Sequence, residues 1–322
     1  MTCKKCEHGP AKRFGFTKAK TARYRCRHCG ATFTEPKQNP LGAHTTSVQA
    51  AAKVFALMIE GMSIRSISRI TGIHKTTILS LLTTVGAKCE RLLDARVRNL
   101  SPDSVQCDEI WQFCYSKEKS VPEEKKYIFG YGDVWTWTAI DADSKLILSW
   151  HVGPRNAHAA STFMSDLASR VNNKIQLTTD GNKVYWAAVV RAFGANVDYG
   201  IINKVYVGPG KAGRYSPGQF VSATRDIGYG SPEPSRISTS FIERHNLTLR
   251  MSLRRFTRLT NGFSKKVDNL KAAVAVFMAW YNFCRVHQTL KGRTPAMAAG
   301  LTDRVWSIEE LIAMESPAAI AA

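Results

Sequence analysis

The sequence predicts an α/β domain with a mixed sheet flanked by helices, preceded by a small cysteine-containing module and an all-α segment. Three observations lead to this fold class. Two Cys-x2-Cys pairs open the chain, helical periodicity runs through residues 44–100, and extended segments begin at Ser101 and later alternate with helical ones. Extended segments that alternate with helical segments are typical of α/β domains.

The composition favours a nucleic-acid partner. The 322 residues hold 45 Lys and Arg against 25 Asp and Glu, giving a net charge of +20 and an isoelectric point of about 9.8. This excess suits a polyanion, although a basic protein kept soluble by charge has the same composition. No signal peptide is visible, and the longest apolar run, residues 272–281, is too short to span a bilayer. We therefore expect a cytoplasmic protein with no membrane contact, whose cysteines are thiols or metal ligands.

The cysteines of the first module have the spacing of a structural zinc site. Cys3 and Cys6 form one pair and Cys26 and Cys29 the other, with nineteen residues between the pairs. Four thiolates can surround one Zn²⁺, and residues 1–38 are too few for a core of their own, so we expect a zinc ribbon with short strands beside the second pair. Accidental pairing and a redox motif are the alternatives. Residues 1–40 contain ten Lys and Arg but two acidic residues, which suits phosphate contacts.

Residues 44–100 predict a helix-turn-helix domain followed by a helical connector. A first helix after Thr46 or Ser47 ends near Gly61, a short amphipathic helix covers residues 63–70, and Gly72 lies in the turn before a third helix. In such a motif the first turn of the second helix of the pair meets base edges. The expected reading residues are His74, Lys75, Thr76 and Thr77. A plain helical bundle has the same periodicity and remains the alternative.

The next 190 residues, 101–290, follow the order of an RNase H-like domain. Extended patterns at residues 104–115, 127–131, 135–141 and 146–152 predict an antiparallel meander. A helix (157–171), a strand (175–179) and a second helix (182–193) follow, and residues 207–236 predict a long Gly/Pro-rich loop. Residues 291–322 predict a C-terminal helical tail.

Two aspartates stand where this sheet would gather ligands. Asp108 lies inside the first core strand, where a carboxylate is costly to bury unless a cation or hydrogen bonds compensate it. Asp180 follows a later strand directly, at the edge where α/β sheets bind ligands. The alternative for Asp180 is a turn or capping residue, because Asp-Gly is common turn chemistry. Asp133, Asp141 and Asp143 compete for the same role, but their positions suit strand boundaries and turns.

A third acidic candidate lies on the helix that begins near Ser240. Glu243 shares one face with Asn246, Arg250 and Arg254, at spacings of three, four and four residues. Ser240 and Glu243 also satisfy the capping-box pattern, so a structural role for the glutamate is the alternative. The neighbouring Arg244 and His245 are expected to contact phosphate or the DNA ends, and Asn246, Arg250 and Arg254 are expected to contact DNA as well.

These motifs together resemble those of IS1-type insertion-sequence transposases of the DDE class. The resemblance rests on the Cys-x2-Cys pairs, Cys107-Asp108-Glu109-Ile110-Trp111, Thr178-Thr179-Asp180-Gly181 and the stretch from Ser240 to Arg250, and it continues through residues 254–260, 263–266 and 281–287. It implies that Asp108, Asp180 and Glu243 are a catalytic triad that holds two Mg²⁺ or Mn²⁺ ions. Carboxylates are the ligands that such hard cations prefer.

The resemblance also implies the partners and the reaction. The expected substrate is double-stranded DNA, both the terminal inverted repeats of an insertion sequence and the target, and bringing two ends together implies a homodimer or higher homo-oligomer. DNA strand cleavage and strand transfer would occur in a prokaryotic cytoplasm, at the nucleoid. Two alternatives remain: a zinc-ribbon/helix-turn-helix transcription regulator, which leaves the three acids unexplained, and an RNase H-like nuclease without strand transfer.

Overall fold

The computed structural model describes residues 1–3, 5–18, 20–34, 39–208, 218–257 and 260–314. The chain divides into two compact units, Met1–His44 and Thr45–Ala322, which are described separately below. The helices within residues 45–100 belong to the second unit, together with the six-stranded sheet and the C-terminal helices. Among the described residues, no helix is both long and apolar enough to cross a lipid bilayer.

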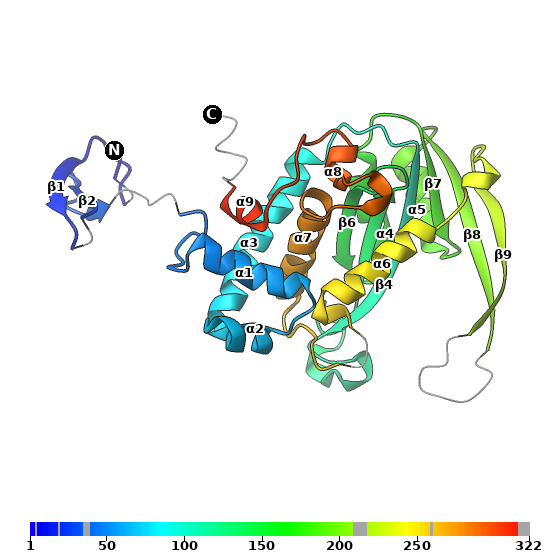
Figure 1. Ribbon diagram of the computed structural model, residues 1–322, viewed down its shortest axis with the longest axis horizontal. Coiled ribbons are helices and arrows are strands. Elements are labelled where there is room, and N and C mark those ends of the chain that lie inside the picture. The colour runs from blue at the N-terminus through cyan, green and yellow to red at the C-terminus, as the bar shows by residue number, and fades with distance from the viewer. Residues whose placement is uncertain (4, 19, 35–38, 209–217, 258–259, 315–322) are drawn as a thin grey trace. The chain divides into compact units, whose positions relative to one another are not determined.

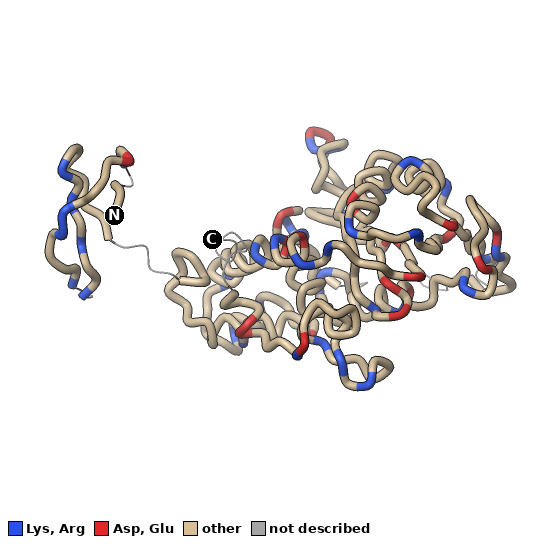
Figure 2. The backbone as a smooth tube through the Cα atoms, turned by 90° about the horizontal axis from the view of Figure 1, so that it is seen from above, with Lys and Arg blue, Asp and Glu red and all other residues tan. Residues whose placement is uncertain are grey.

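The first unit is a three-stranded antiparallel sheet in the order β1-β2-β3 (Figure 1). Its strands are β1 (Lys12–Phe16), β2 (Ala22–Arg25) and β3 (Thr32–Thr34), so the strands expected on both sides of the second cysteine pair are present. All of β1 is exposed, whereas Cys3 and Cys26 are buried. The interior of this unit is therefore built around sulfur atoms. Figure 2 shows Lys and Arg along its strands.

Three helices open the second unit: α1 (Val48–Ile59), α2 (Ile64–Thr71) and α3 (Lys75–Arg96). Ser47 caps α1 by accepting a hydrogen bond from the Ala50 amide, as one of the two expected caps. Helix α3 packs closely on a later helix, α7 (Val267–Phe283), and a methyl group at Gly86 would collide with Ala272 of α7. The close packing of α3 and α7 joins the N-terminal helices to the rest of the unit.

A six-stranded mixed sheet forms the centre of the second unit, in the order β6-β5-β4-β7-β8-β9. Strands β4, β5 and β6 are antiparallel neighbours, β4, β7 and β8 run parallel, and β9 returns antiparallel to β8. The strands are β4 (Ser104–Cys114), β5 (Gly132–Asp141), β6 (Ile147–Gly153), β7 (Ile175–Asp180), β8 (Val197–Val207) and β9 (Gln219–Tyr229). Strand β4 therefore lies inside the sheet, with a neighbour on each side.

Helices cover both faces of this sheet (Figure 1). Trp137 of β5 packs against Phe163 of α4 (Ala157–Ala168) and Tyr185 of α5 (Val184–Phe193), so these two helices lie on one face. Helix α6 (Ser240–Ser252) lies on the opposite face and contacts β4 and β5. The remaining helices are α8 (Pro295–Ala298) and α9 (Ile308–Ala313), with short 3₁₀ helices at Glu118–Ser120, Glu123–Lys125, Pro234–Arg236, Arg254–Phe256 and Gln288–Leu290.

The structure corrects two expectations about the sheet. Residues 127–131 form turns instead of a strand: Tyr127 is 99% exposed and has a φ of 66°. The loop expected at residues 207–236 contains β9, which pairs with the unpredicted strand β8; residues 209–217 lie outside the described part. Strand β9 is exposed along almost its whole length, so its sequence lacks the apolar alternation that marks a half-buried strand.

The C-terminal segment packs against the N-terminal helices. Leu311 and Ile312 of α9 are buried, and Lys88 of α3 donates a hydrogen bond to the Ile312 carbonyl at 2.6 Å. The tail predicted for residues 291–322 is thus an ordered part of the second unit as far as Met314, and residues 315–322 lie outside the described part.

Candidate active site

Asp108 and Asp180 lie on the same face of neighbouring parallel strands. The register of β4 and β7 pairs Gln106 with Thr178, and each aspartate follows two residues later on its strand. Side chains two residues apart on a strand point to the same face, and adjacent strands are separated by about 4.8 Å. The two carboxylates predicted from sequence are therefore brought together by the strand register.

The Asp108 carboxyl lies in an environment that disfavours its charge. Burial raises its pKa to about 7, and the negative charges of Glu109, Asp180 and Glu243 add to this effect. Two hydrogen bonds partly compensate: the Glu109 amide donates to Oδ1 at 2.8 Å and Asn246 Nδ2 donates to Oδ2 at 2.7 Å. A carboxyl whose pKa is raised by burial and by neighbouring acids is in the electrostatic condition that a bound cation relieves.

Helix α6 is fixed to strand β4 by a side chain that sequence analysis missed. Gln106 Oε1 accepts hydrogen bonds from the amides of Phe241 at 2.9 Å and Ile242 at 3.2 Å. These are two of the first amides of α6, which have no partner inside the helix. Gln106 is 2% exposed and lies two residues before Asp108 on the same face, so it holds the N-terminus of α6 beside the aspartates.

Glu243 lies on the first turn of α6 but does not cap it. Thr239, and not Ser240, is the N-cap residue of α6, and its side chain forms no capping hydrogen bond with the helix backbone. Glu243 Oε1 accepts a hydrogen bond from Thr239 Oγ1 at 2.6 Å and forms an ion pair with Lys204 of β8. Its side chain is 48% exposed. The capping alternative is therefore wrong, and the glutamate is held by Lys204 next to the Asp108 face.

The oxygen donors around Asp108 suit a hard divalent cation. Three buried oxygens near the aspartates have no hydrogen-bond partner among the described residues: Thr138 Oγ1, Thr178 Oγ1 and Asn246 Oδ1. Thr138 is the cross-strand neighbour of Asp108, and Thr178 precedes Asp180 by two residues. Neutral oxygens and carboxylates are the ligands that Mg²⁺ and Mn²⁺ prefer. Among the described residues, the three carboxylates are not grouped closely enough to form a metal cluster as they lie, and Glu243 is paired with Lys204.

Glu109 forms a buried network behind the two aspartates. Its side chain, 1% exposed, accepts hydrogen bonds from Arg155 Nε at 2.6 Å, Asn182 Nδ2 at 2.8 Å and Tyr185 OH at 2.6 Å. The backbone N–H of Asn182 in turn donates a hydrogen bond to Asp180 Oδ1 at 3.1 Å. The sequence showed a carboxylate among apolar side chains but not its partners, which come from two later segments.

The chain after Asp180 passes close to β8. A methyl group at Gly181 would meet Asn203 Oδ1, the end of an exposed side chain that can move aside. The competing acids have other roles or positions. Asp141 accepts hydrogen bonds from the Asp143 and Ser144 amides at 3.0 and 3.3 Å and so builds the turn between β5 and β6, while Asp133 is exposed.

The four cysteines of the first unit gather as the sequence predicted. Their sulfur atoms lie within 4.8 Å of one another, and two pairs, Cys3 with Cys29 and Cys6 with Cys26, are 3.5 Å apart. A tetrahedral Zn²⁺ site with Zn–S bonds of about 2.3 Å needs sulfur separations of about 3.8 Å. Backbone amides of Cys29 and His28 lower the pKa of Cys26 to about 6, which favours its thiolate. This geometry fits one zinc ion.

Comparisons with known proteins give weak similarities to transposase complexes. No protein-family model and no curated protein matches the chain. Among solved structures, a pre-cleavage Mos1 transpososome matches with a TM-score of 0.20 and 12% identity over 49% of this chain and 60% of that chain. The Mos1 strand transfer complex (TM-score 0.29, 11% identity, 84% of this chain, 77% of that one) and the piggyBac synaptic complex with hairpin DNA (0.36, 10%, 84%, 70%) also match. Scores this low do not establish a shared function, so its assignment rests on the site geometry.

The predicted base-reading residues lie at an exposed helix start. His74 is the N-cap of α3, and its ring lies 2.7 Å from Thr76 Oγ1. His74, Lys75 and Thr76 are exposed and Thr77 is partly exposed. Their accessibility is compatible with DNA contact. Helix α3 continues without a break into the predicted connector as far as Arg96.

The DNA-contact residues predicted on one helix separate into two groups, and Arg254 lies beyond α6, in the 3₁₀ helix Arg254–Phe256, so its predicted place on the helix face of Glu243 is wrong. Arg244 and Arg254 are exposed and Arg250 is partly exposed, as a phosphate contact requires. His245 is 1% exposed and packs against Phe277 and Tyr281 of α7, so the phosphate contact expected of it is wrong. Asn246 is 9% exposed and bonds to Asp108, so its position is at the acids instead of the DNA surface.

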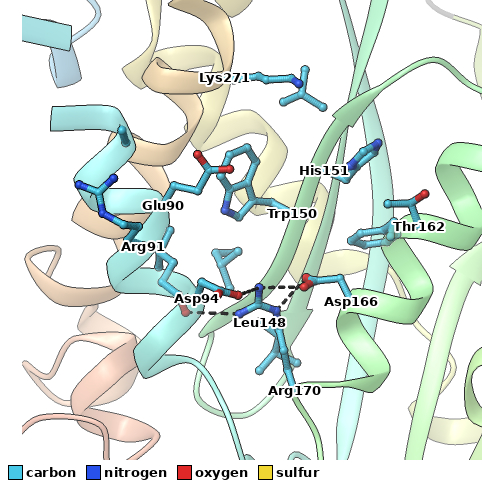
Figure 3. A pocket seen from close by; sticks show the side chains of 15 residues that line it. Glu90, Arg91, Asp94, Leu148, Trp150, His151, Thr162, Asp166, Arg170 and Lys271 are labelled. Carbon is cyan, nitrogen blue, oxygen red and sulfur yellow. Dashed lines mark hydrogen bonds and ion pairs between the residues drawn. The ribbon is translucent and has the colours of Figure 1, made fainter. Parts of the chain in front are cut away.

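A second cluster of charged residues has a structural role. Figure 3 shows a pocket of about 460 Å³ lined by residues of α3, β6, α4 and α7. Arg170 at its base donates to the Leu93 and Val97 carbonyls at the end of α3 and pairs with Asp94 and Asp166. Its guanidinium therefore ties the end of α3 to α4 and satisfies the helix-end carbonyls.

Proposed function

We propose that this chain is an IS1-type DNA transposase of the DDE class with an RNase H-like catalytic domain. The observation that carries the proposal is the register that places Asp108 and Asp180 side by side, with Glu243 on a helix anchored to the same strand by Gln106. The order of the strands, an antiparallel meander followed by two parallel strands, supports the RNase H-like assignment.

Asp108, Asp180 and Glu243 are the residues that would hold two Mg²⁺ or Mn²⁺ ions. Two bound metal ions supply activation of the attacking oxygen and stabilisation of the leaving oxygen of a phosphodiester. Asn246 orients the Asp108 carboxylate, Gln106 holds α6 in place, and Glu109 positions the segment that follows Asp180 through Asn182. Lys204 keeps Glu243 beside the site until a metal ion competes for it.

In the proposed reaction, water first hydrolyses a phosphodiester at the element end and leaves a 3′-hydroxyl. That hydroxyl then attacks a target phosphorus, forming one phosphodiester and releasing one 3′-hydroxyl of the target. The zinc ribbon, with Zn²⁺ on Cys3, Cys6, Cys26 and Cys29, and the start of α3 would bind the terminal inverted repeats. The protein would act on cytoplasmic, nucleoid DNA as a dimer or larger oligomer.

Strand transfer of a labelled duplex carrying the terminal repeat that flanks the gene, into a plasmid, tests the proposal. Joined product is expected with Mg²⁺ or Mn²⁺ from wild type, and loss of at least about a hundredfold from Asp108→Ala, Asp180→Ala and Glu243→Ala, with DNA binding retained. The matched control is Asp143→Ala, an exposed turn carboxylate. It should transfer strands as wild type does.

The outcomes separate the candidate functions. Cleavage without joining would favour a nuclease, and binding without metal-dependent chemistry in wild type would favour a transcription regulator. Wild-type strand transfer by Asp108→Ala would refute the proposed catalytic triad.

A further inference from the structure

A pocket of about 580 Å³ lies at the far end of β4 from Asp108. It is lined by the last residues of β4, by the segment that follows, and by the chain after α6. None of the residues assigned above to metal binding lines it. What distinguishes it is the combination of aromatic rings, cations and unpaired polar atoms in its wall.

Aromatic rings form one part of this wall. Phe113 and Phe263 have ring centroids 4.7 Å apart, and Trp111 lies 6.0 Å from Phe113. Tyr115, also in the lining, packs edge-on against Tyr131. Trp111, Phe113, Tyr115 and Phe263 are partly exposed, so their rings are not fully used in the core. Partly exposed rings of this kind offer faces on which a planar group can stack.

Four basic residues line the same pocket, Lys117, Arg250, Arg255 and Lys265, and the last two lie beside its aromatic rings. Arg255 Nε donates to Ser264 Oγ at 2.8 Å, and Arg255 has no carboxylate in ion-pair contact among the described residues. Burial lowers the pKa of Arg255 to about 10, so its guanidinium is still charged at neutral pH. Lys265 lies 4.4 Å above the Phe263 ring. A partly buried cation without an anion indicates that an anion comes from outside the chain.

Two buried polar atoms in the lining also lack partners. Gln112 is 3% exposed; its Nε2 donates to Thr136 Oγ1 at 3.0 Å, but its Oε1 has no hydrogen-bond partner among the described residues. Ser116 Oγ is in the same situation. Buried polar atoms are nearly always satisfied in folded proteins, so two orphans in one pocket suggest a ligand with hydrogen-bonding edges.

The pocket and the candidate active site share strand β4 and helix α6. Gln112 follows Asp108 by four residues on β4, a distance of about 13 Å along the strand. Arg250, seven residues after Glu243 on α6, also lines the pocket. A DNA strand bound at the acids would therefore have the pocket within reach of its neighbouring nucleotides.

We propose that this pocket binds one unstacked nucleotide of a DNA strand, with its base against Phe263 and Phe113 and its phosphate on Arg255 and Lys265. The identity of the strand as DNA rests on the proposed function. The planar face of a base can stack on the aromatic rings, and its polar edge can form hydrogen bonds with Gln112 and Ser116. The phosphate of the same nucleotide supplies the anion that Arg255 lacks.

Photochemical cross-linking of the full chain tests this assignment. The probe is a short single-stranded oligothymidylate with one internal 5-iodo-2′-deoxyuridine, irradiated with long-wavelength ultraviolet light and mapped by mass spectrometry. Cross-links are expected on Trp111, Phe113, Tyr115 or Phe263. Phe263→Ala and Lys265→Ala should each lower the yield at the pocket and the oligonucleotide affinity about tenfold, because each removes one main contact. Phe220→Ala, which removes a 60%-exposed ring from β9, is the matched control and should change neither.

The cross-linking experiment can also contradict the proposed nucleotide pocket. Cross-links confined to the first unit or to α3, or an unchanged pocket yield in both variants with wild-type melting temperatures, would overturn the proposal. Asp108→Ala should cross-link like wild type. Cross-links without strand transfer in wild type would leave the pocket supported and the proposed function refuted, and strand transfer without cross-links would do the reverse.

Discussion

Asn246 donates a hydrogen bond from Nδ2 to Asp108 Oδ2 at 2.7 Å, which links α6 directly to the carboxylate inside β4. Hydrogen bonds to a charged acceptor stabilise the charged form. Asn246→Ala should therefore raise the pKa of Asp108 further and move the acidic limb of the pH–cleavage profile to higher pH. Leu247→Ala, on the exposed side of α6, is the control. An unshifted limb would show that this bond does not tune the acid.

The charge of Asp108 should destabilise the metal-free fold. Its pKa is raised from 3.8 to about 7, so the folded chain binds more protons than the unfolded chain between these values. Stability is then lost as pH rises through this window, by on the order of 3 kcal/mol. Asp108→Asn should melt above wild type at about pH 8 and equal it below about pH 4 in a chelator.

Added Mg²⁺ should reduce this difference at about pH 8, because the ion stabilises wild type and not the amide variant. The measurement is calorimetry with and without Mg²⁺. A variant that melts below wild type at every pH would contradict the predicted penalty.

His245 should make the fold sensitive to acid. Burial lowers its pKa to about 3, and the charges of Arg285 and His287 act in the same direction. The unfolded chain binds a proton near pH 6.5 that the folded chain does not, so stability is full above that pH and falls below it. His245→Phe keeps a ring against Phe277 and Tyr281 and should lose less stability at about pH 5, by about 2 kcal/mol. A stability that changes equally with pH in wild type and in His245→Phe would refute this prediction.

Removal of zinc should unfold the first unit alone. With β1 exposed, β2 and β3 at most partly buried, and its interior formed by sulfur, this unit has little apolar core to replace the metal. Cys26→Ser, or a strong chelator, should release about one equivalent of zinc and make residues 1–44 sensitive to protease, while the main melting transition of the second unit stays in place. Cys284→Ser is the control and should retain the zinc. Loss of zinc without proteolysis would mean that the fold does not depend on it.

Lys204 should compete with metal for Glu243. The ion pair between them is partly exposed, so its own contribution to stability is small. Lys204→Met removes the competitor and should lower the Mg²⁺ concentration for half-maximal cleavage, whereas Lys204→Arg should keep it near the wild-type value. A higher Mg²⁺ requirement in the methionine variant would show that Lys204 positions the glutamate for the metal instead.

Much of the site was predictable because it depends on local pattern. A carboxylate inside a core strand and another directly after a later strand are visible as Asp108 and Asp180, and helical spacing put Asn246 on the face of Glu243. The partners were not predictable. Gln106, Lys204 and Arg155 reach partners that lie 135, 39 and 46 residues away in sequence, so only the strand order and register bring them together. His245 was misplaced because helical spacing does not reveal that α7 covers that side of α6.

The unbroken course of α3 has a consequence for the DNA. Its 22 residues span about 33 Å, close to ten base pairs of duplex, and its end is tied to α4 by Arg170 within the unit that holds the acids. If the start of α3 binds a specific DNA sequence, the rigid connection between α3 and the acids fixes the number of base pairs between that sequence and the cleaved phosphate. No flexible linker lies between them to accommodate a different number of base pairs. An element that gains one base pair near its tip would still be bound, but it would be cut one phosphate away from its true end.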